Sequence, residues 1–224
     1  LWACAILMTV IVLAIIIFVS QKGLRTFYSV SVSEFFFASK WDPDSGKFGG
    51  LSFIIGSLQV TLLSILLATP LALSCSIFLA KNAPKGIKNI LRPAIDLYVA
   101  IRSIVYGYLG LTVLIPFLRE TFDVSGGFGL MPAVLVLAVM ILPTIITLSE
   151  DAINSVPQSL EEASIALGAT RLQTIYKVIL PSAITGIVSA VVLAMARAIG
   201  ETMAVQMVIG NTPVIARSLF TPTS

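Results

Sequence analysis

Five long apolar stretches dominate this sequence and leave few folds open to it. They cover approximately residues 1–19, 51–80, 93–118, 130–149 and 183–209. Each stretch supplies the roughly 20 apolar residues that a helix needs to cross a bilayer core. Lipid offers no hydrogen-bond partners to an irregular backbone, so helices are the expected form of all five. The sequence therefore predicts an all-α, polytopic transmembrane helical bundle.

The composition supports this prediction and excludes several classes of function. Hydrophobic residues make up 57% of the chain and charged residues 11%, whereas soluble domains carry about a quarter charged residues. Histidine is absent, which excludes Ser-His-Asp catalysis, histidine-ligated metals and histidine proton relays. The Lys and Arg residues form no dense basic block, so nucleic acid is not an expected partner. Cys4 and Cys75 lie in apolar stretches and are expected to be small buried hydrophobic residues.

The connections between the stretches give a first orientation. The connection 81–92 carries four basic residues and no acidic one, which places it in the cytoplasm by the positive-inside rule. The connection 150–182 then lies in the cytoplasm as well, and 20–50 and 119–129 lie outside. Because 20–50 also carries four basic residues, the loop charges differ little between the two orientations.

The chain opens inside an apolar run without an initiator methionine, and we expect it to be trimmed at one or both ends. The first run has the apolar character of a signal peptide. No small-residue cleavage site follows it at a suitable spacing, so a true span is expected.

The cytoplasmic connection 150–182 has the pattern of a helix, a turn and a second short helix. Glu161 and Glu162 lie early in the first helix, where acidic side chains complement the helix dipole, and its apolar face includes Ala163 and Leu167. The expected boundary residues are Pro157 and Gly168 for the first helix, Thr170 for the cap of the second, and Pro181 for the start of the last span. A partner protein or the membrane surface would have to cover the apolar face of so short a helix.

The motif Glu162-Ala163-Ser164, then Gly168, then Val178-Ile179-Leu180-Pro181 resembles the EAA loop of type I ABC importer permeases. The family pattern is Glu-Ala-Ala, three residues, Gly, nine residues and Ile-x-Leu-Pro. In that family the loop forms a coupling helix that docks in a groove on the ATP-binding subunit. The resemblance implies that the ATPase-coupling residues are Glu161, Glu162, Ala163, Leu167 and Gly168.

Two charged residues lie four apart in the last apolar stretch, Arg197 and Glu201. On a continuous helix they would share one face, and charges at that depth are costly unless paired or hydrated. One interpretation is an internal ion pair that fixes helix packing. In the other, Arg197 faces the translocation path and meets an anionic substrate, while Glu201 holds the arginine. The rigid fork of a guanidinium suits a tetrahedral oxyanion.

The segment around these charges, residues 196–205, closely resembles the corresponding span of phosphate importer permeases, and Asn211-Thr212-Pro213 fits as well. Residues 103–107 and Gly110-Leu111 resemble the PstC-type subunit, one of two related permeases in that importer. Together the resemblance covers roughly residues 50–215.

Arg102 departs from this family pattern, which usually has a proline at that position and a helix break there. Without this proline, the sequence alone does not predict the helix break of the third span. We assign Arg102 to the substrate pathway, as added positive charge, with pairing to Glu201 or Asp96 as the alternative. Asp96 itself is expected to pair with Arg92, one helical turn away.

The resemblance implies the type I ABC importer permease fold, with about five spans in this chain and a sixth beyond the C-terminus. Residues 1–50 would be an N-terminal span and external loop. Residues 51–224 would be the C-terminally incomplete permease core, with 150–182 as its cytoplasmic coupling loop. The chain would be a multi-pass protein of a bacterial or archaeal cytoplasmic membrane, and it would translocate inorganic phosphate by alternating access.

The implied partners are a homologous second permease subunit, two ATP-binding subunits, a periplasmic or lipid-anchored phosphate-binding protein, and membrane lipid. No P-loop pattern occurs in the sequence, so ATP hydrolysis is expected in the separate ATPase. That ATPase would bind ATP and Mg, and this chain is expected to hold no cofactor, metal or catalytic residue and to be no enzyme.

Two alternatives remain open. The same class of permease could carry another solute, such as molybdate, sulfate or an amino acid. The second alternative is a secondary transporter or channel that works without ATP. Such proteins commonly show inverted repeats with broken midplane helices, and we find no such pair of repeats in the sequence.

Overall fold

The computed structural model describes residues 2–27, 31–39, 41–42, 47–122, 126–210 and 212. Contacts divide the chain into two compact units, Leu1–Ile54 and Ile55–Ser224, each described by itself. Asn211 and Pro213 of the phosphate-permease segment lie outside the described residues.

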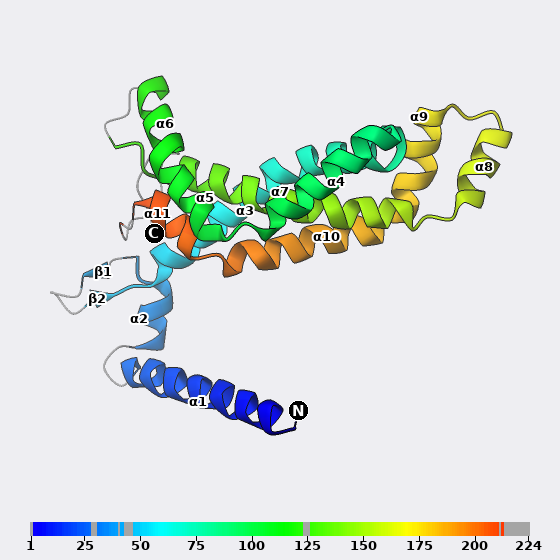
Figure 1. Ribbon diagram of the computed structural model, residues 1–224. Coiled ribbons are helices and arrows are strands. Elements are labelled where there is room, and N and C mark those ends of the chain that lie inside the picture. The colour runs from blue at the N-terminus through cyan, green and yellow to red at the C-terminus, as the bar shows by residue number, and fades with distance from the viewer. Residues whose placement is uncertain are drawn as a thin grey trace. The chain divides into compact units, whose positions relative to one another are not determined.

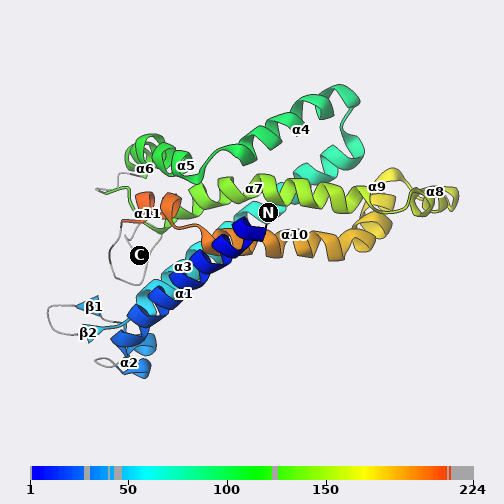
Figure 2. The same cartoon turned by 60° about the horizontal axis from the view of Figure 1, so that its bottom comes forward.

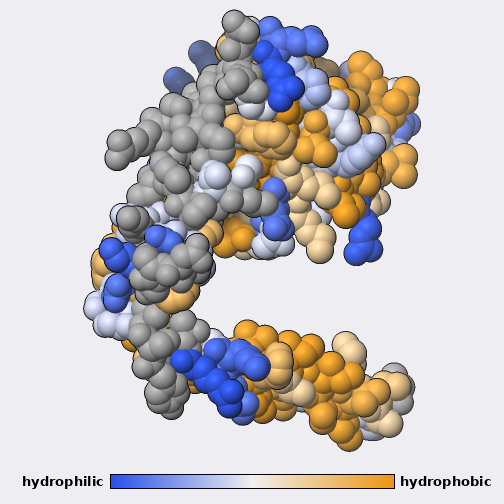
Figure 3. Space-filling model, turned by 90° about the vertical axis from the view of Figure 1, so that its left-hand side faces the viewer, coloured by the Kyte–Doolittle hydropathy of each residue, from blue (hydrophilic) through white to orange (hydrophobic). Residues whose placement is uncertain are grey.

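The first unit contains one long apolar helix and a small aromatic cluster. Helix α1 (Trp2–Thr26) is followed by α2 (Val32–Phe37) and by a two-stranded antiparallel hairpin, β1 (Trp41–Asp42) with β2 (Lys47–Phe48). The ring of Trp41 makes edge-to-face contacts with Phe48 at 5.7 Å and Phe53 at 5.2 Å between centroids. None of the described residues of α1 is buried, and the mostly orange colour of this helix at the bottom of Figure 3 shows its apolar surface. Cys4, expected to be buried, is exposed on it, because α1 buries none of its described residues within its own unit.

The second unit is entirely helical where it is described (Figure 1). Its elements are α3 (Leu51–Ile77, beginning in the first unit), the π-helical turn η2 (Phe78–Asn82), α4 (Lys85–Ala100), α5 (Ser103–Leu109), η3 (Gly110–Leu114), α6 (Ile115–Phe122), α7 (Leu130–Asn154), α8 (Gln158–Ala166), α9 (Arg171–Thr174), η4 (Ile175–Ile179), α10 (Leu180–Gly200) and α11 (Met203–Ile209). The all-α prediction is confirmed.

Helix α7 is the centre of this unit and lies between α4 and α10 in both ribbon views (Figure 1; Figure 2). It is an apolar helix of 25 residues, and Ile141 and Ile145 in its middle are fully buried. Small residues let its neighbours approach: Ala68 and Ala72 of α3 and Ala194 of α10 are also fully buried. Close packing through small residues is typical of helix association in lipid, where no hydrophobic driving force acts between helices.

Four helices are long and apolar enough to cross a membrane, and the pair formed by α4 with α5–α6 makes a fifth, bent by 92°. The five predicted spans are thus present among the described residues, but two of them are interrupted. The third span breaks at Ile101 and Arg102, so the expected break is kept although no proline stands there. Both residues have extended backbone angles, with φ of −68° and ψ of 130° and 143°, which any residue can adopt.

The last span, predicted as one helix over 183–209, is also interrupted. Helix α10 ends at Gly200, Glu201 is extended with φ −82° and ψ 115°, and α11 begins at Met203. The prediction of a continuous helix is wrong because the apolar pattern does not mark this break.

Candidate functional site

The predicted helix-turn-helix of residues 155–181 is present and lies at one end of the second unit, away from α6 (Figure 1). Helix α8 ends in a left-handed glycine, Gly168, with φ +85°. The N–H of Gly168 donates to the carbonyl of Ile165 at 2.9 Å, and that of Ala169 donates to Ser164 at 3.2 Å. These two bonds satisfy carbonyls that the helix end leaves free, which is why a glycine suits this position.

The second helix, α9, begins with the predicted cap. The hydroxyl of Thr170 accepts from the N–H of Gln173 at 3.4 Å, and the Gln173 amide oxygen accepts from the N–H of Thr170 at 3.0 Å. The hydroxyls of Ser164 and Thr174 lie 3.0 Å apart and join α8 to α9. Pro181 lies in the first turn of α10, as predicted. Local bonds therefore fix the shape of the loop.

Helix α8 has no buried residue. The side chain of Leu167 is 90% exposed and that of Leu160 43% exposed, and Ala163 is exposed on the same face. Glu162 is exposed too, and its carboxylate accepts a hydrogen bond from the amide of Gln158 at 2.8 Å. The face that carries Ala163 and Leu167 is uncovered and available to a partner.

Glu161 differs from its neighbour, because it points back toward the bundle. Its Oε2 lies 2.7 Å from Nζ of Lys81, which belongs to η2 at the end of α3. Two further ion pairs lie between α4 and the end of α7: Lys88 with Glu150 at 2.9 Å, and Arg92 with Asp151 at 3.3 Å. Three of the four basic residues of the connection 81–92 are therefore paired with acidic residues of the connection 150–182.

We did not predict these ion pairs from the sequence, in which Arg92 was expected to pair with Asp96. That prediction is wrong: Asp96 is exposed, and Arg92 reaches the neighbouring helix instead. The distribution of charges along the sequence did contain a signal for these ion pairs. Residues 81–92 carry only basic charges, whereas residues 150–162 carry four acidic residues and no basic one.

Arg197 is half-buried on α10, and its Nη1 donates to the hydroxyl of Thr144 on α7 at 2.9 Å. It forms no ion pair with any residue that the structure describes. Glu201 does not hold it, because the helix ends between them and the Glu201 carboxylate accepts from the N–H of Ala204 at 3.2 Å, in the first turn of α11. The interpretation of Arg197 and Glu201 as an internal ion pair is thus wrong for this structure, and Arg197 bonds instead to the neutral hydroxyl of Thr144.

Arg102 lies at the bend of the third span and is exposed. Within the described ranges it forms no ion pair with Glu201 or Asp96, so both pairings proposed from the sequence are wrong. The bend is held by tyrosines instead: the Tyr106 hydroxyl donates to the carbonyl of Tyr98 at 2.7 Å, and their ring centroids lie 5.1 Å apart.

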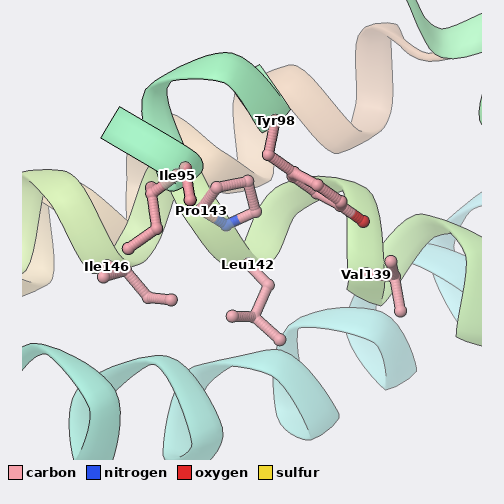
Figure 4. A pocket seen from close by; sticks show the side chains of 7 residues that line it. Ile95, Tyr98, Val139, Leu142, Pro143 and Ile146 are labelled. Atoms are coloured by element: carbon pink, nitrogen blue, oxygen red, sulfur yellow. The ribbon is translucent and has the colours of Figure 1, made fainter. Parts of the chain in front are cut away.

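A cavity of about 270 Å³ lies between α4 and α7. In Figure 4, Ile95 and Tyr98 extend from α4 toward Val139, Leu142, Pro143 and Ile146 of α7. The lining is apolar except for the tyrosine hydroxyl, and no charged residue contributes. This cavity therefore lacks the donors that an anion requires.

Gly107 of α5 and Gly110 of η3 allow the bent span to lie directly against α11, and Gly110 also allows close contact with α7. A Cβ added at Gly107 would come within 2.9 Å of the Cα of Ala204, and one at Gly110 within 2.8 Å of Val136 and Val208. The contact places the start of α11, and with it Glu201, beside the bent span.

Replacing Gly107 by alanine is expected to lower stability, because the clash is with backbone that cannot move aside. Overpacking of this kind costs about 1–3 kcal/mol, so thermal unfolding in detergent should occur several degrees lower. Gly86→Ala on α4 is the matched control, since nothing lies within 4 Å of its added Cβ. Equal melting of the two variants would contradict the close approach of α5 and α11.

Comparison with known proteins gives the following similarities. Residues 72–223 match the family model of the binding-protein-dependent transport system inner membrane component. The chain is 50% identical to the probable ABC transporter permease protein YqgH of Bacillus subtilis, over 97% of this chain and 72% of that one. It is 37% identical to the phosphate transport system permease protein PstC of Mesorhizobium japonicum, over 98% and 73%.

Solved structures agree with these relatives. An inward-facing structure of the MetNI methionine ABC transporter matches with a TM-score of 0.56 and 27% identity, covering 65% of this chain and 67% of that chain. A second inward-facing MetNI structure matches with a TM-score of 0.54 and 25% identity, covering 72% and 74%.

Proposed function

We propose that this chain, which belongs to the binding-protein-dependent transport system inner membrane component family, carries inorganic phosphate across the cytoplasmic membrane. It is an ABC importer permease with a multi-pass transmembrane fold, and its family is one of transport subunits rather than enzymes. Family membership implies ATPase subunits and a substrate-binding protein as partners. The phosphate cargo is our proposal.

The similarity to PstC proteins carries this proposal. It extends over 98% of the chain for the Mesorhizobium japonicum protein and over 85% for that of Pasteurella multocida, at 37% and 35% identity. Arg197 supplies a physical reason, because its guanidinium is half-buried in a membrane helix and bonds only to a neutral hydroxyl among the described residues. A cation without a carboxylate partner can receive an oxyanion through its fork of donors.

The remaining assignments follow from this proposal. The permease core would cover residues 51–224 and pair with a homologous second permease. Two ATP-binding subunits would hold ATP and Mg, leaving this chain without a cofactor. Phosphate would arrive on a periplasmic or lipid-anchored binding protein. The loop 150–182 would face the cytoplasm, with Glu162, Ala163 and Leu167 against the ATPase.

The mechanism would be a two-state shift. ATP binding would close the ATPase pair and displace α8, and the bundle would switch between inward-facing and outward-facing states that both ATP and the binding protein bias. The two interrupted spans supply breaks where such a shift can occur, at residues 101–102 and 201–202.

A competition experiment tests the cargo. Vesicles that hold the complete importer would be given radiolabelled phosphate with an excess of unlabelled phosphate, sulfate, molybdate or methionine. In a second arm, each of the other solutes would be supplied in labelled form. We expect only unlabelled phosphate to compete strongly. Uptake of one of the other solutes in place of phosphate would keep the importer class and overturn the cargo.

A further inference from the structure

The coupling helix α8 is joined by the chain to only part of the bundle. Residues 155–157 connect it to α7, and α9 with η4 connects it to α10. Its packing follows the same route, because α8 lies against α9 and η4. Helix α3 is more than 75 residues away in the sequence and depends on side chains to follow any movement of α8.

Part of this link is apolar, because Leu73, Ile77 and Ala80 pack against the buried cluster that includes Ile175 and Ile179 of η4. One ion pair joins this end of α3 to α8 itself. Nζ of Lys81 and Oε2 of Glu161 lie 2.7 Å apart, and their side chains are 19% and 34% exposed. Lys81 lies in η2, which continues α3 without a turn between them. Both groups are partly shielded from water, so their attraction is screened less than that of a fully exposed pair.

The neighbouring pairs provide a comparison within the same chain. Lys88 and Glu150 lie between α4 and α7, and Arg92 and Asp151 lie there too, with side chains 47% and 55% exposed and a longer distance of 3.3 Å. Neither pair touches α8. In the part of the chain that the structure describes, Lys81–Glu161 is the ion pair that reaches the coupling helix.

We propose that the Lys81–Glu161 ion pair is a positioning link that makes α3 follow the coupling helix, so that ATPase movement reaches α3 as well as α7 and α10. Glu161 then acts inside the permease, whereas Glu162 beside it is free to face the ATPase. This inference rests on the proposed function and adds a role for two of its residues.

Without the ion pair, α8 would move relative to α3, which would keep only its apolar packing on η4. ATP hydrolysis would continue, because the exposed face of α8 is unchanged, but fewer phosphate ions would cross for each ATP. A typical coupling between two sites changes a binding equilibrium by about fivefold or more. We expect the ratio of phosphate imported to ATP hydrolysed to fall by a similar factor when the ion pair is lost.

Charge reversal tests this proposal in the complete importer. Lys81→Glu and Glu161→Lys should each lower phosphate per ATP at least about fivefold, with the ATPase still bound, and the double variant should recover most of the loss. Arg92→Glu, Asp151→Arg and their combination are the matched controls, and they should change the ratio little because exposed pairs contribute little. A merely structural role would instead lower yield and ATPase association.

Hydrogen exchange of residues 158–166 in the same complex gives a readout that does not depend on the cargo. Exchange should be faster in each single variant and return toward native in the double variant. The proposal is overturned if the single variants show the native ratio of phosphate to ATP and native hydrogen exchange. It is also overturned if the double variant is as impaired as the single variants. Native importer that moves no phosphate would reject the proposed function, and hydrogen exchange would still decide the link.

Discussion

Replacing Arg197 by glutamine is expected to reduce ATP-driven phosphate uptake by about tenfold to a hundredfold. Glutamine can still donate to Thr144, so the contact between α10 and α7 is kept while the charge is lost. A hydrogen bond to a charged group contributes about 1.5–3 kcal/mol, and each 1.4 kcal/mol is about a tenfold change in binding. The initial rate of radiolabelled phosphate uptake measures the effect.

Three variants define what the Arg197 result means. Arg197→Lys keeps the charge without the planar fork and should be intermediate. Thr144→Val removes only the neutral partner and should have a smaller effect. Arg119→Gln makes the same change at an exposed position of α6, where the guanidinium donates to the carbonyl of Gly126 at 3.3 Å, and this variant should transport normally. If the Arg197→Gln variant took up phosphate at the native rate, Arg197 would not be part of the substrate pathway.

Replacing Glu162 by lysine is expected to release the ATPase from the permease. The Glu162 side chain is exposed on α8 and bonds to Gln158 of its own helix, so the change leaves the fold of the loop intact. Placing the wrong charge in a docked interface costs 2 kcal/mol or more, which weakens binding about 30-fold or more. Copurification of the ATPase with the permease, and a titration of their association, measure this loss.

The same charge change at Glu120 is the control for Glu162. Glu120 is exposed on α6, at the other end of the unit from α8 (Figure 1), so Glu120→Lys should leave ATPase association unchanged. If Glu162→Lys bound the ATPase as native permease does, the α8 face would not be the docking surface.

The local geometry of the coupling loop could be predicted from sequence because short-range bonds determine it. Gly168 adopts the left-handed conformation, and Thr170 and Gln173 bond to each other's backbone, all within a few residues of chain. The apolar stretches likewise predicted five spans, since length and hydropathy alone decide whether a helix can cross the bilayer.

The charge partners could not be predicted, because they depend on residues distant in the sequence, and the break in the last span has only a weak local signal. Glu201 caps α11 where α10 has ended at Gly200, but a lone glycine inside an apolar run is tolerated in a helix and does not by itself predict a break. Arg92 had Asp96 one turn away but pairs with Asp151, 59 residues on, which comes close only after α4 packs on α7. Lys81 and Glu161 lie 80 residues apart.

Phosphate accumulation by vesicles that hold the complete importer, with and without ATP, tests the central claim most directly. Purified permease, its ATPase and the binding protein would be reconstituted, and radiolabelled phosphate followed over time. The account predicts phosphate accumulation against its gradient when ATP is present, and none without ATP. Phosphate uptake that proceeds equally without ATP would contradict the account.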